Sequence, residues 1–145
     1  MNAIAAHAKY GGPCIVIGLG TATTFGAVSA EGEFLGGVIA PGIQVSTNAL
    51  VSAGAQLRNI EFVAPRSVIG KTTVEAIQAG VILGHAGLVD TIVERLRDEL
   101  GASAPAVATG GLAPVIRPHT KTIDHHEPDL PLEGLRIIFE RNAAR

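Results

Sequence analysis

The hydrophobic positions of the chain follow two different periods, and each stretch of constant period predicts one element. Residues 14–17 (CIVI) form a continuous apolar, β-branched run, which is typical of a buried strand. Residues 21–29, rich in Thr, Val and Phe, predict a second strand, and after a tight turn at 31–33 the segment 34–40 (FLGGVIA) predicts a third. The pattern therefore predicts a meander of three strands, which the following Pro-Gly pair ends.

Apolar residues at helical spacing predict one long helix at 72–100, which Gly101 ends. Its middle carries three glycines, and each costs roughly 1 kcal/mol in a helix relative to alanine. That cost predicts the close approach of a neighbouring helix, either within the domain or across a dimer. The glycines are Gly80, Gly84 and Gly87, and the expected apolar face carries Ile77, Val81, Leu88, Ile92, Val93, Leu96 and Leu100.

Shorter segments complete the predicted order of elements. Helices are expected at 1–10, 43–57, 112–118 and 130–142, strands at 104–109 and 121–124, and an irregular connection, compatible with a short strand, at 58–70. After the first helix the order is β-β-β-α-α-β-α-β-α. It predicts a single α/β domain over residues 1–145, with a mixed sheet and a long helix.

Composition narrows the classes of function. Hydrophobic residues make up 47% of the 145-residue chain and charged residues 17%, which is enough apolar side chain for a core. A net charge of -2, with 3% aromatic residues and no Trp, excludes the basic, base-stacking surface of a nucleic-acid-binding protein. Glycine is in excess, at 18 residues where an average usage of about 7% predicts roughly ten, so we expect tight turns or close backbone approach to a ligand.

The single cysteine, Cys14, excludes an internal disulfide and a cysteine-based zinc site. It lies in the first predicted strand, where a buried, unreactive thiol is expected. The N-terminus lacks the basic and apolar regions of a signal peptide, and no uninterrupted apolar run reaches the roughly 18 residues of a membrane span. We therefore expect a cytoplasmic protein with no membrane partner.

A glycine- and threonine-rich segment, 18–24 (GLGTATT), follows the first predicted strand and is the first candidate binding motif. A dinucleotide fingerprint, G-x-G-x-x-G, would need a glycine where Thr23 lies and a helix where a strand is predicted, so the segment does not fit. A strand-turn-strand with this tip can instead present backbone amides and threonine hydroxyls to a phosphate. The alternative is a hairpin whose threonines only favour strand structure.

Two other glycine-containing turns stand next to predicted helices. Gly70-Lys71-Thr72 matches the end of a P-loop, but Pro65 stands where that motif needs its first glycine. The amides of the helix start could still bind an anion, with an ordinary N-cap as the alternative. Residues 108–111 (ATGG) connect a strand to a helix and are compatible with either a nucleotide contact or a simple tight turn.

The segment 124–127 (DHHE), with Asp129, has the composition of a metal site. Adjacent side chains on extended chain point to opposite sides, and no distant third ligand stands out. A solvated loop is therefore the prediction. The other histidines, His7, His85 and His119, show no partner pattern, and the sequence contains no recognisable Ser-His-Asp or Cys-His arrangement.

Several separated motifs resemble the C-terminal half of type III pantothenate kinase, in the same order and over nearly the whole chain. They read YGGPCIVIGLGTATTFGAVSAEGEFLGGVIAPGIQVSTNAL, then VIGKTTVEAIQAGVILGHAGLVDTIVERL, then ATGGLA, then DLPLEGLRIIFERN. That family belongs to the acetate and sugar kinase, Hsp70 and actin superfamily. The resemblance therefore implies a ribonuclease H-like (actin-like ATPase) domain, β-β-β-α-β-α-β-α, which agrees with the predicted order.

The resemblance also implies an activity, the ATP-dependent phosphorylation of pantothenate to 4'-phosphopantothenate in coenzyme A biosynthesis. Members of the family are homodimers that use Mg²⁺ and a monovalent cation, K⁺ or NH₄⁺. By the family pattern, Thr73 contacts pantothenate across the dimer. The residues that the pattern implies for ATP binding are Gly20, Thr21, Thr23, Thr24, Gly110 and Gly111.

The chain departs from the family in ways that lower its expected activity. Gly18 and Gly26 stand where the family motif D-F-G-T-A-T-T-F-D carries aspartates, and loss of the first carboxylate predicts loss of the monovalent-cation site. The N-terminal domain with its D-x-G-N-T loop, and the G-x-D-R motif with the general-base aspartate, are missing. We therefore expect no catalytic residue and no kinase activity in the chain alone, which is either a truncated product or a subunit, with a second copy or a separate N-terminal half as its partner. The alternative is a noncatalytic dimerisation module.

Overall fold

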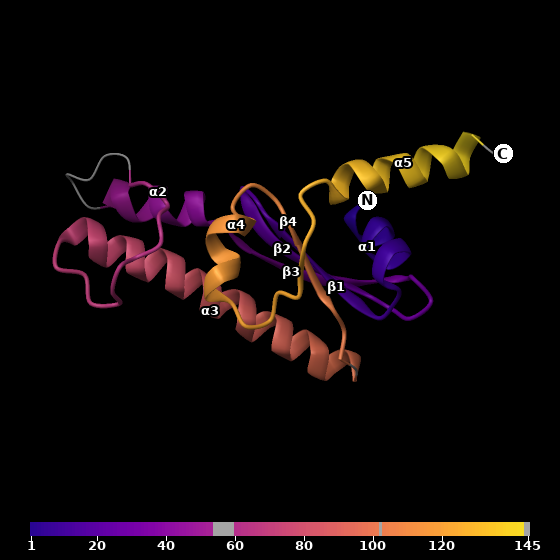
Figure 1. Cartoon of the computed structure of the whole chain (residues 1–145), viewed down its shortest axis with the longest axis horizontal. Helices are drawn as coiled ribbons and strands as arrows, with labels where there is room; N and C mark the ends of the chain where they lie inside the picture. Colours follow the sequence, from indigo (N-terminus) through magenta and orange to yellow (C-terminus); the bar gives the residue numbers. More distant parts are fainter. Residues whose placement is uncertain (54–59, 102, 144–145) are drawn as a thin grey trace.

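The computed structural model describes residues 1–53, 60–101 and 103–143, which build a five-stranded mixed sheet with helices on both faces (Figure 1). The strand order is β3-β2-β1-β4-β5. The first three strands pair antiparallel, whereas β4 pairs parallel with β1 and β5 pairs parallel with β4. The strands are β1 (Cys14–Leu19), β2 (Ala22–Val28), β3 (Phe34–Pro41), β4 (Ala106–Thr109) and β5 (His125–His126).

The helices lie on both faces of this sheet. In the described ranges they are α1 (Asn2–Tyr10), α2 (Ile43–Ala53), α3 (Thr73–Leu100), α4 (Ala113–Ile116), the 3₁₀ helix η1 (Arg117–His119) and α5 (Leu130–Ala143). The long helix α3 packs on one face, and α1 and α5 pack on the other (Figure 1). The predicted α/β class is confirmed, with its mixed sheet and long helix and the element order of a ribonuclease H-like (actin-like ATPase) domain.

Strand β1 lies in the middle of the sheet and is buried on both faces. Ile15, Ile17 and Leu19 pack in the cluster under α3, whereas Cys14 and Val16 pack in the cluster under α1 and α5. A strand covered on both faces needs apolar residues at every position, which explains the uninterrupted run in the sequence. Burial raises the pKa of the Cys14 thiol, as expected for a cysteine that is not activated.

The buried face of α3 differs from the predicted one. Its buried residues are Ala79, Ile82, His85, Ala86, Val89 and Val93. Of the predicted apolar face, Val93 is among them, while Val81, Leu88, Ile92, Leu96 and Leu100 pack against the core from the flanks and are partly buried. The stripe of α3 that faces the sheet includes alanines and a histidine. A face predicted from large apolar side chains alone is therefore rotated by about one residue from the observed buried face.

The length and composition of α3 would also allow it to span a membrane, and its most apolar 18-residue window has a mean hydropathy of 1.5. Of that window 33% is buried inside the chain. Because the buried stripe packs on the sheet, α3 has the contacts of a core helix.

The glycines of α3 do not mark a close approach within the described chain. A Cβ built at Gly80, Gly84 or Gly87 meets no described atom within 4 Å. The first of the two alternatives, a helix packed closely within the domain, is therefore not found among the described residues. The second, a contact across a dimer, stays a prediction.

The last predicted strand is displaced. The sequence pattern predicts it at 121–124, but β5 is His125–His126. The Asp90 carboxylate, on α3, accepts the Lys121 N–H at 2.9 Å and the Thr122 N–H at 3.0 Å. The Asp90 side chain thus accepts the N–H groups that a strand would donate to its neighbour. Regular pairing with β4 therefore begins only at His125.

The region after α2 is described in part. The predicted helix at 43–57 is observed as Ile43–Ala53, and its remaining residues lie outside the described ranges. The predicted connection at 58–70 is irregular over its described part, 60–70, which contains no strand.

Candidate functional site

Two of the candidate glycine turns meet at the carboxyl ends of β1 and β4. These strands are parallel, and Gly18 pairs in register with Thr109. Gly110 follows with a φ of 107°, and a Cβ there would lie 2.3 Å from the Leu19 carbonyl oxygen. Since only glycine fits so close an approach, this turn packs directly against the start of the β1–β2 hairpin turn. The carboxyl ends of neighbouring parallel strands commonly bind ligands in α/β folds.

Backbone contacts hold the tip of the β1–β2 hairpin. The Gly20 N–H donates to the Ala22 carbonyl at 3.2 Å, and the Gly42 N–H donates to the Thr21 carbonyl at 3.1 Å. A Cβ at Gly42 would lie 2.3 Å from the carbonyl oxygens of both Gly20 and Thr21, so the chain after β3 passes this tip at contact distance. The tip is therefore held by contacts within the chain, and a preformed site of this kind lowers the entropic cost of binding.

The threonines of this hairpin point to different sides. Thr21 and Thr24 are exposed, whereas Thr23 is 1% exposed. The Thr23 Oγ1 lies 2.8 Å from the Nε2 of His85 on α3, within hydrogen-bond distance. The hydroxyls of Thr21 and Thr24 are thus accessible to a ligand, while the Thr23 hydroxyl is engaged inside the chain.

The six residues predicted for ATP binding fall on the β1–β2 hairpin, including the start of β2, and on the turn after β4, but the predicted pantothenate residue lies elsewhere. Thr73 is the first residue of α3, is exposed, and lines a groove of about 490 Å³ between α2 and α3. No predicted ATP-binding residue is among the described residues that line this groove. His85 lines it and also contacts Thr23, so one side chain lies between the groove and the hairpin.

The start of α3 uses its own side chains to satisfy its amides. The Glu75 carboxylate accepts the Lys71 N–H at 2.8 Å and the Thr72 N–H at 3.2 Å. The Thr72 hydroxyl in turn accepts the Glu75 N–H at 3.2 Å, which completes a capping box. Of the two alternatives for the G-K-T segment, the ordinary N-cap is the one observed, because the carboxylate of Glu75 occupies the place of an anion.

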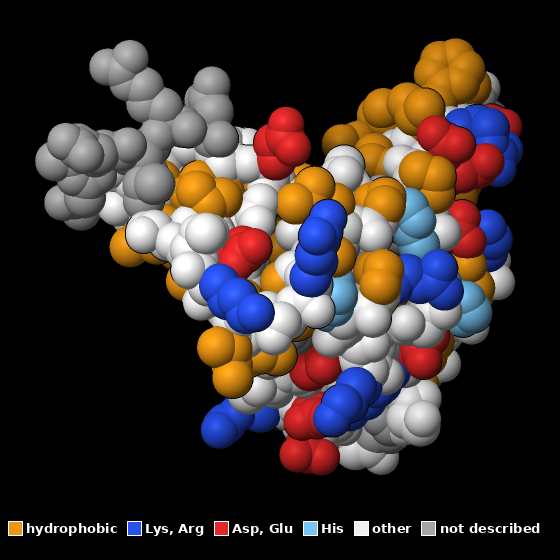
Figure 2. All heavy atoms as spheres, turned by 60° about the vertical axis from the view of Figure 1, so that its left-hand side comes forward, with side chains coloured by type: hydrophobic (Ala, Val, Ile, Leu, Met, Phe, Trp, Pro, Cys, Tyr) orange, Lys and Arg blue, Asp and Glu red, His pale blue; other side chains and the backbone are white. Residues whose placement is uncertain are grey.

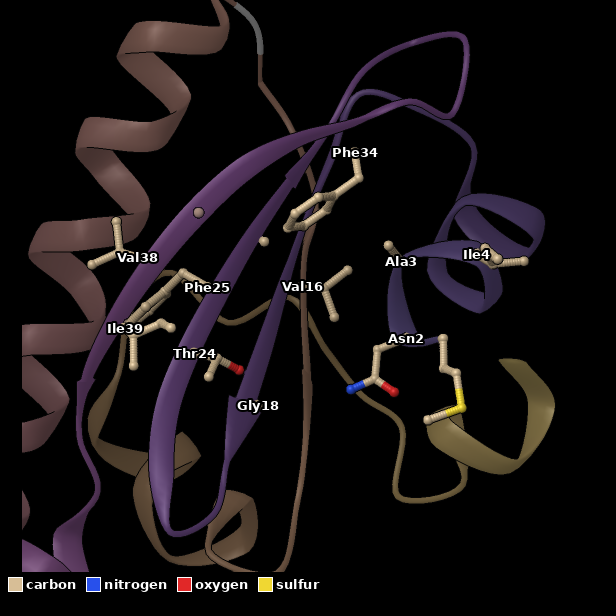
Figure 3. Close-up of a pocket in the computed structure, with 13 residues that line it drawn as sticks. Asn2, Ala3, Ile4, Val16, Gly18, Thr24, Phe25, Phe34, Val38 and Ile39 are labelled. Carbon is tan, nitrogen blue, oxygen red and sulfur yellow. The ribbon is translucent and has the colours of Figure 1, made fainter. Parts of the chain in front are cut away.

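Gly18 and Gly26 open onto the other face of the sheet. They line a groove of about 700 Å³ between β1–β3 and the start of α1, where Thr24 and Phe34 also lie (Figure 3). The described residues lining this groove include no Asp, Glu, His or Cys. The side chains described here offer no carboxylate to a monovalent cation, and the loss of that site stays a prediction.

The DHHE segment is a structural contact and not a solvated loop. Glu127 accepts hydrogen bonds from Lys9 Nζ at 2.6 Å and from the Tyr10 hydroxyl, and these bonds hold the pKa of its carboxyl below the ordinary value. His125 stacks on Tyr10 with ring centroids 4.2 Å apart. The prediction of a solvated loop is therefore wrong, because α1 packs on this segment. No group of three metal-ligating side chains occurs in the described part of the chain.

His85 is the residue of the site that the sequence analysis missed. Nothing near it in the sequence indicates a partner, because Thr23 is 62 positions away. A signal was nevertheless present, since His85 lies three or four positions from Ile82 and Val89 and therefore shares their buried helical face. A polar side chain on a buried face requires a hydrogen-bond partner.

Comparison with known proteins agrees with these features. A sequence model of the family described as type III pantothenate kinase matches residues 1–95. Type III pantothenate kinases of Parafrankia sp. (strain EAN1pec) and Rhodococcus jostii (strain RHA1) are 58% and 55% identical to the chain and align with 98% and 100% of it. The aligned region is 56% and 55% of those two proteins, so the chain spans little more than half the length of the curated relatives it matches.

A solved structure shows the same fold. The crystal structure of a protein described as a Baf family transcriptional activator from Campylobacter jejuni superimposes with a TM-score of 0.68 at 21% identity, over 97% of this chain and 63% of that one. At this identity the likeness concerns the fold alone. The family model and the sequence identities carry the assignment, and by them the chain belongs to the type III pantothenate kinase family.

Proposed function

We propose that this chain supplies the nucleotide-binding wall of a pantothenate kinase, which transfers the γ-phosphoryl group of ATP to the hydroxyl of pantothenate. The observation that carries the proposal is the meeting of two glycine turns, at Gly20–Thr24 and Gly110–Gly111, in a chain of this family. Phosphoryl transfer depends mainly on positioning and on stabilising charge. Backbone amides and the exposed hydroxyls of Thr21 and Thr24 suit that task, because they donate to phosphate oxygens without adding charge.

The remaining components enter as part of the same proposal. ATP binds with Mg²⁺, the exposed Thr73 contacts pantothenate, and the protein acts in the cytoplasm without a membrane or nucleic-acid partner. The groove between α2 and α3 supports a homodimer contact at this place, because Gly80 and Gly84 line it and leave it open to a second helix. Thr73 lies on the rim of that groove, where a partner subunit could complete the pantothenate site.

The open groove beside Gly18 and the exposed apolar side of α5 support a second contact. Leu132, Leu135 and Phe139 are 64%, 49% and 73% exposed, and hydrophobic side chains gather at the end of the molecule formed by α5 (Figure 2). The relative from Parafrankia sp. matches the chain over 56% of its own length, and the rest of it is additional chain that could cover these surfaces. We assign the surfaces to that half, which would supply the second wall of the ATP site and the general base.

The decisive experiment compares the chain alone with the reconstituted enzyme. Purified 145-residue chain should release no ADP that depends on both ATP and pantothenate. Addition of the portion of the Rhodococcus jostii kinase that the chain does not match should restore such release. ADP release by the chain alone would refute the proposed incompleteness, and a reconstituted complex that binds no ATP would refute the kinase assignment.

The second candidate is a noncatalytic dimerisation module, which the open α2–α3 groove favours. A ligand that binds only the native state raises the melting temperature. Stabilisation by MgATP supports the kinase wall. A stable dimer whose melting temperature does not respond to nucleotide supports the module.

A further inference from the structure

A buried pair, His85 on α3 and Thr23 on β2, links the long helix to the candidate ATP-binding hairpin. Their side chains are 7% and 1% exposed, and Nε2 and Oγ1 lie 2.8 Å apart. Thr23 lies between the exposed Thr21 and Thr24, so its contact with His85 anchors the backbone segment that carries both. A buried hydroxyl that loses its partner costs about 1–3 kcal/mol, so this contact bears on the position of the hairpin.

Among the described residues, the elements around His85 offer no ionisable group that would stabilise an imidazolium, and α4, which also packs on α3, carries none. The elements packed against it on two sides, β2 and α2, contain no titratable side chain, and the groove it lines is otherwise lined by uncharged residues. On α3 the nearest charged residue is Asp90, which is bound to the amides of Lys121 and Thr122. η1 also packs on α3 and carries Arg117 and His119, neither of which forms a hydrogen bond with His85.

Protonation of His85 would therefore place a charge in an apolar environment. Burial lowers the pKa of His85, and in the described part of the chain no carboxylate beside it opposes the effect. In the neutral form one ring nitrogen donates and the other accepts, so Nε2 can exchange a hydrogen bond with the Thr23 hydroxyl in either tautomer. In the charged form Nε2 can only donate, so the hydroxyl proton of the buried Thr23 loses its acceptor at this nitrogen. The charge is better solvated on the side of the groove between α2 and α3, which His85 lines, and we expect a turn toward it to break the contact with Thr23.

We infer that His85 is a positioning residue, which holds the β1–β2 hairpin in its nucleotide-binding shape only while its imidazole is neutral. The inference rests on the proposed function of the hairpin. It assigns to the chain a dependence of nucleotide affinity on pH that does not pass through the reacting groups. It also implies that binding in the α2–α3 groove affects the hairpin. A ligand or partner helix there fills the space into which a charged His85 would turn, and so it favours the neutral, hydrogen-bonded form.

The first test follows the hairpin without nucleotide. Histidine-selective NMR titration of the chain, with His85 identified by the signal lost in His85→Gln, gives its protonation midpoint. The amide signals of Gly20, Thr23 and Thr24 should shift with that same midpoint and should stay constant over the same range in His85→Gln. Amides that ignore the titration of His85, or that shift equally in the variant, would overturn the inference whatever the hairpin binds.

The second test measures binding of a fluorescent MgATP analogue from about pH 7.5 down through the midpoint found by NMR, which should lie below the ordinary histidine pKa of about 6.5 because burial lowers the pKa of His85. Affinity of the natural chain should fall up to about tenfold beyond any fall in His85→Gln, tenfold being the change in ratio that one pKa unit represents. Gln keeps a hydrogen bond without titrating in this range, so this variant also measures the titration of the nucleotide phosphates.

Two further variants complete the design. Thr23→Val, which removes the hydroxyl and keeps the shape, should weaken binding at high pH and flatten the profile. His119→Gln, which changes another histidine packed near α3, should keep the profile of the natural chain. Identical profiles for the natural chain and His85→Gln would overturn the inference. Absence of nucleotide binding at every pH would instead refute the proposed function, while the amide titration still decides the role of His85.

Discussion

The two faces of the sheet are covered to very different extents. On one face, α3 holds Ile82, Val89 and Val93 at 0% exposure against the sheet. On the other face, α1 and α5 pack over β1 and β4 and leave the outer strand uncovered, with Phe34 and Ile39 of β3 at 65% and 79% exposure. The chain thus has one closed face, under α3, and one open face, beside α1 (Figures 1 and 3).

The difference shows that stability and the candidate site depend on different parts of the molecule. The closed face contains the larger cluster of buried side chains, so it contributes most of the hydrophobic stabilisation. The open face carries Gly18, Thr24 and the groove beside them, to which the proposed function assigns additional chain. Substitutions on the closed face should therefore mainly lower the stability of the fold, whereas substitutions on the open face should mainly weaken assembly with additional chain.

The largest contrast is expected for the same substitution on each face. Ile82→Ala removes a fully buried side chain and should lower the free energy of unfolding by about 2–5 kcal/mol. Ile39→Ala, at a position that is 79% exposed, should change it by less than about 0.5 kcal/mol. Chemical denaturation measures both. Equal losses would show that the open face is covered in solution, for example by a second copy of the chain.

The next contrast is between two neighbouring glycines, Gly110 and Gly111, in the turn after β4. Gly110→Ala forces a side chain against the Leu19 carbonyl at a φ of 107°, and it should lower the free energy of unfolding by about 1–3 kcal/mol. The same substitution should also weaken nucleotide binding. Gly111→Ala is the matched control, because a Cβ there meets no described atom within 4 Å. Thermal melting with and without MgATP separates the two effects. If both variants retained full stability, the close packing of the two turns would be wrong.

A smaller effect separates two adjacent threonines at the start of α3. Thr72→Ala removes the cap and should cost about 1 kcal/mol without a specific effect on substrate. Thr73→Ala should leave the free energy of unfolding nearly unchanged and weaken pantothenate binding in the reconstituted enzyme. Calorimetric titration with pantothenate distinguishes them, and the opposite assignment would follow if only Thr72→Ala lost affinity.

The smallest expected effect concerns the attachment of α1 beside the open face. The pKa of Glu127 is lowered by hydrogen bonds from Lys9 and then Tyr10, so its ionised form binds more strongly in the folded state. The stability it contributes is present above its ordinary pKa of 4.5 and is lost as pH falls through the lowered value. Glu127→Gln should reduce the slope of stability against pH in this range, and an unchanged slope would show that the contact is weak in solution.

The sequence was informative wherever a local pattern determines the structure. The meander, the boundaries of α3 and the position of Cys14 follow from runs, caps and burial along a few residues. Long-range polar contacts were not predictable, because no local pattern records them. Asp90 binds the amides of Lys121 and Thr122 and delays β5, and His85 reaches Thr23 across 62 positions.

The candidate site was predictable in a similar way. The resemblance indicated the two glycine turns, and the family of the chain is confirmed. The resemblance alone could not tell which threonine hydroxyls face outward, since that depends on the register of β2 and on α3 behind it. Nor could it show that Glu75 occupies the anion position at the start of α3.

Strand β3 has one more consequence, for the behaviour of the chain in solution. It forms one edge of the sheet, and its residues, Phe34–Pro41, include no charged side chain. Natural sheets usually protect such an edge with charge, a bulge or a covering segment, because unpaired strand amides recruit other strands. In β3 the features that can hinder pairing with another strand are the register shift opposite Ala27/Val28 and Pro41 at its end. Self-association of the chain through β3 should therefore increase with protein concentration. A partner that covers this edge would prevent that self-association.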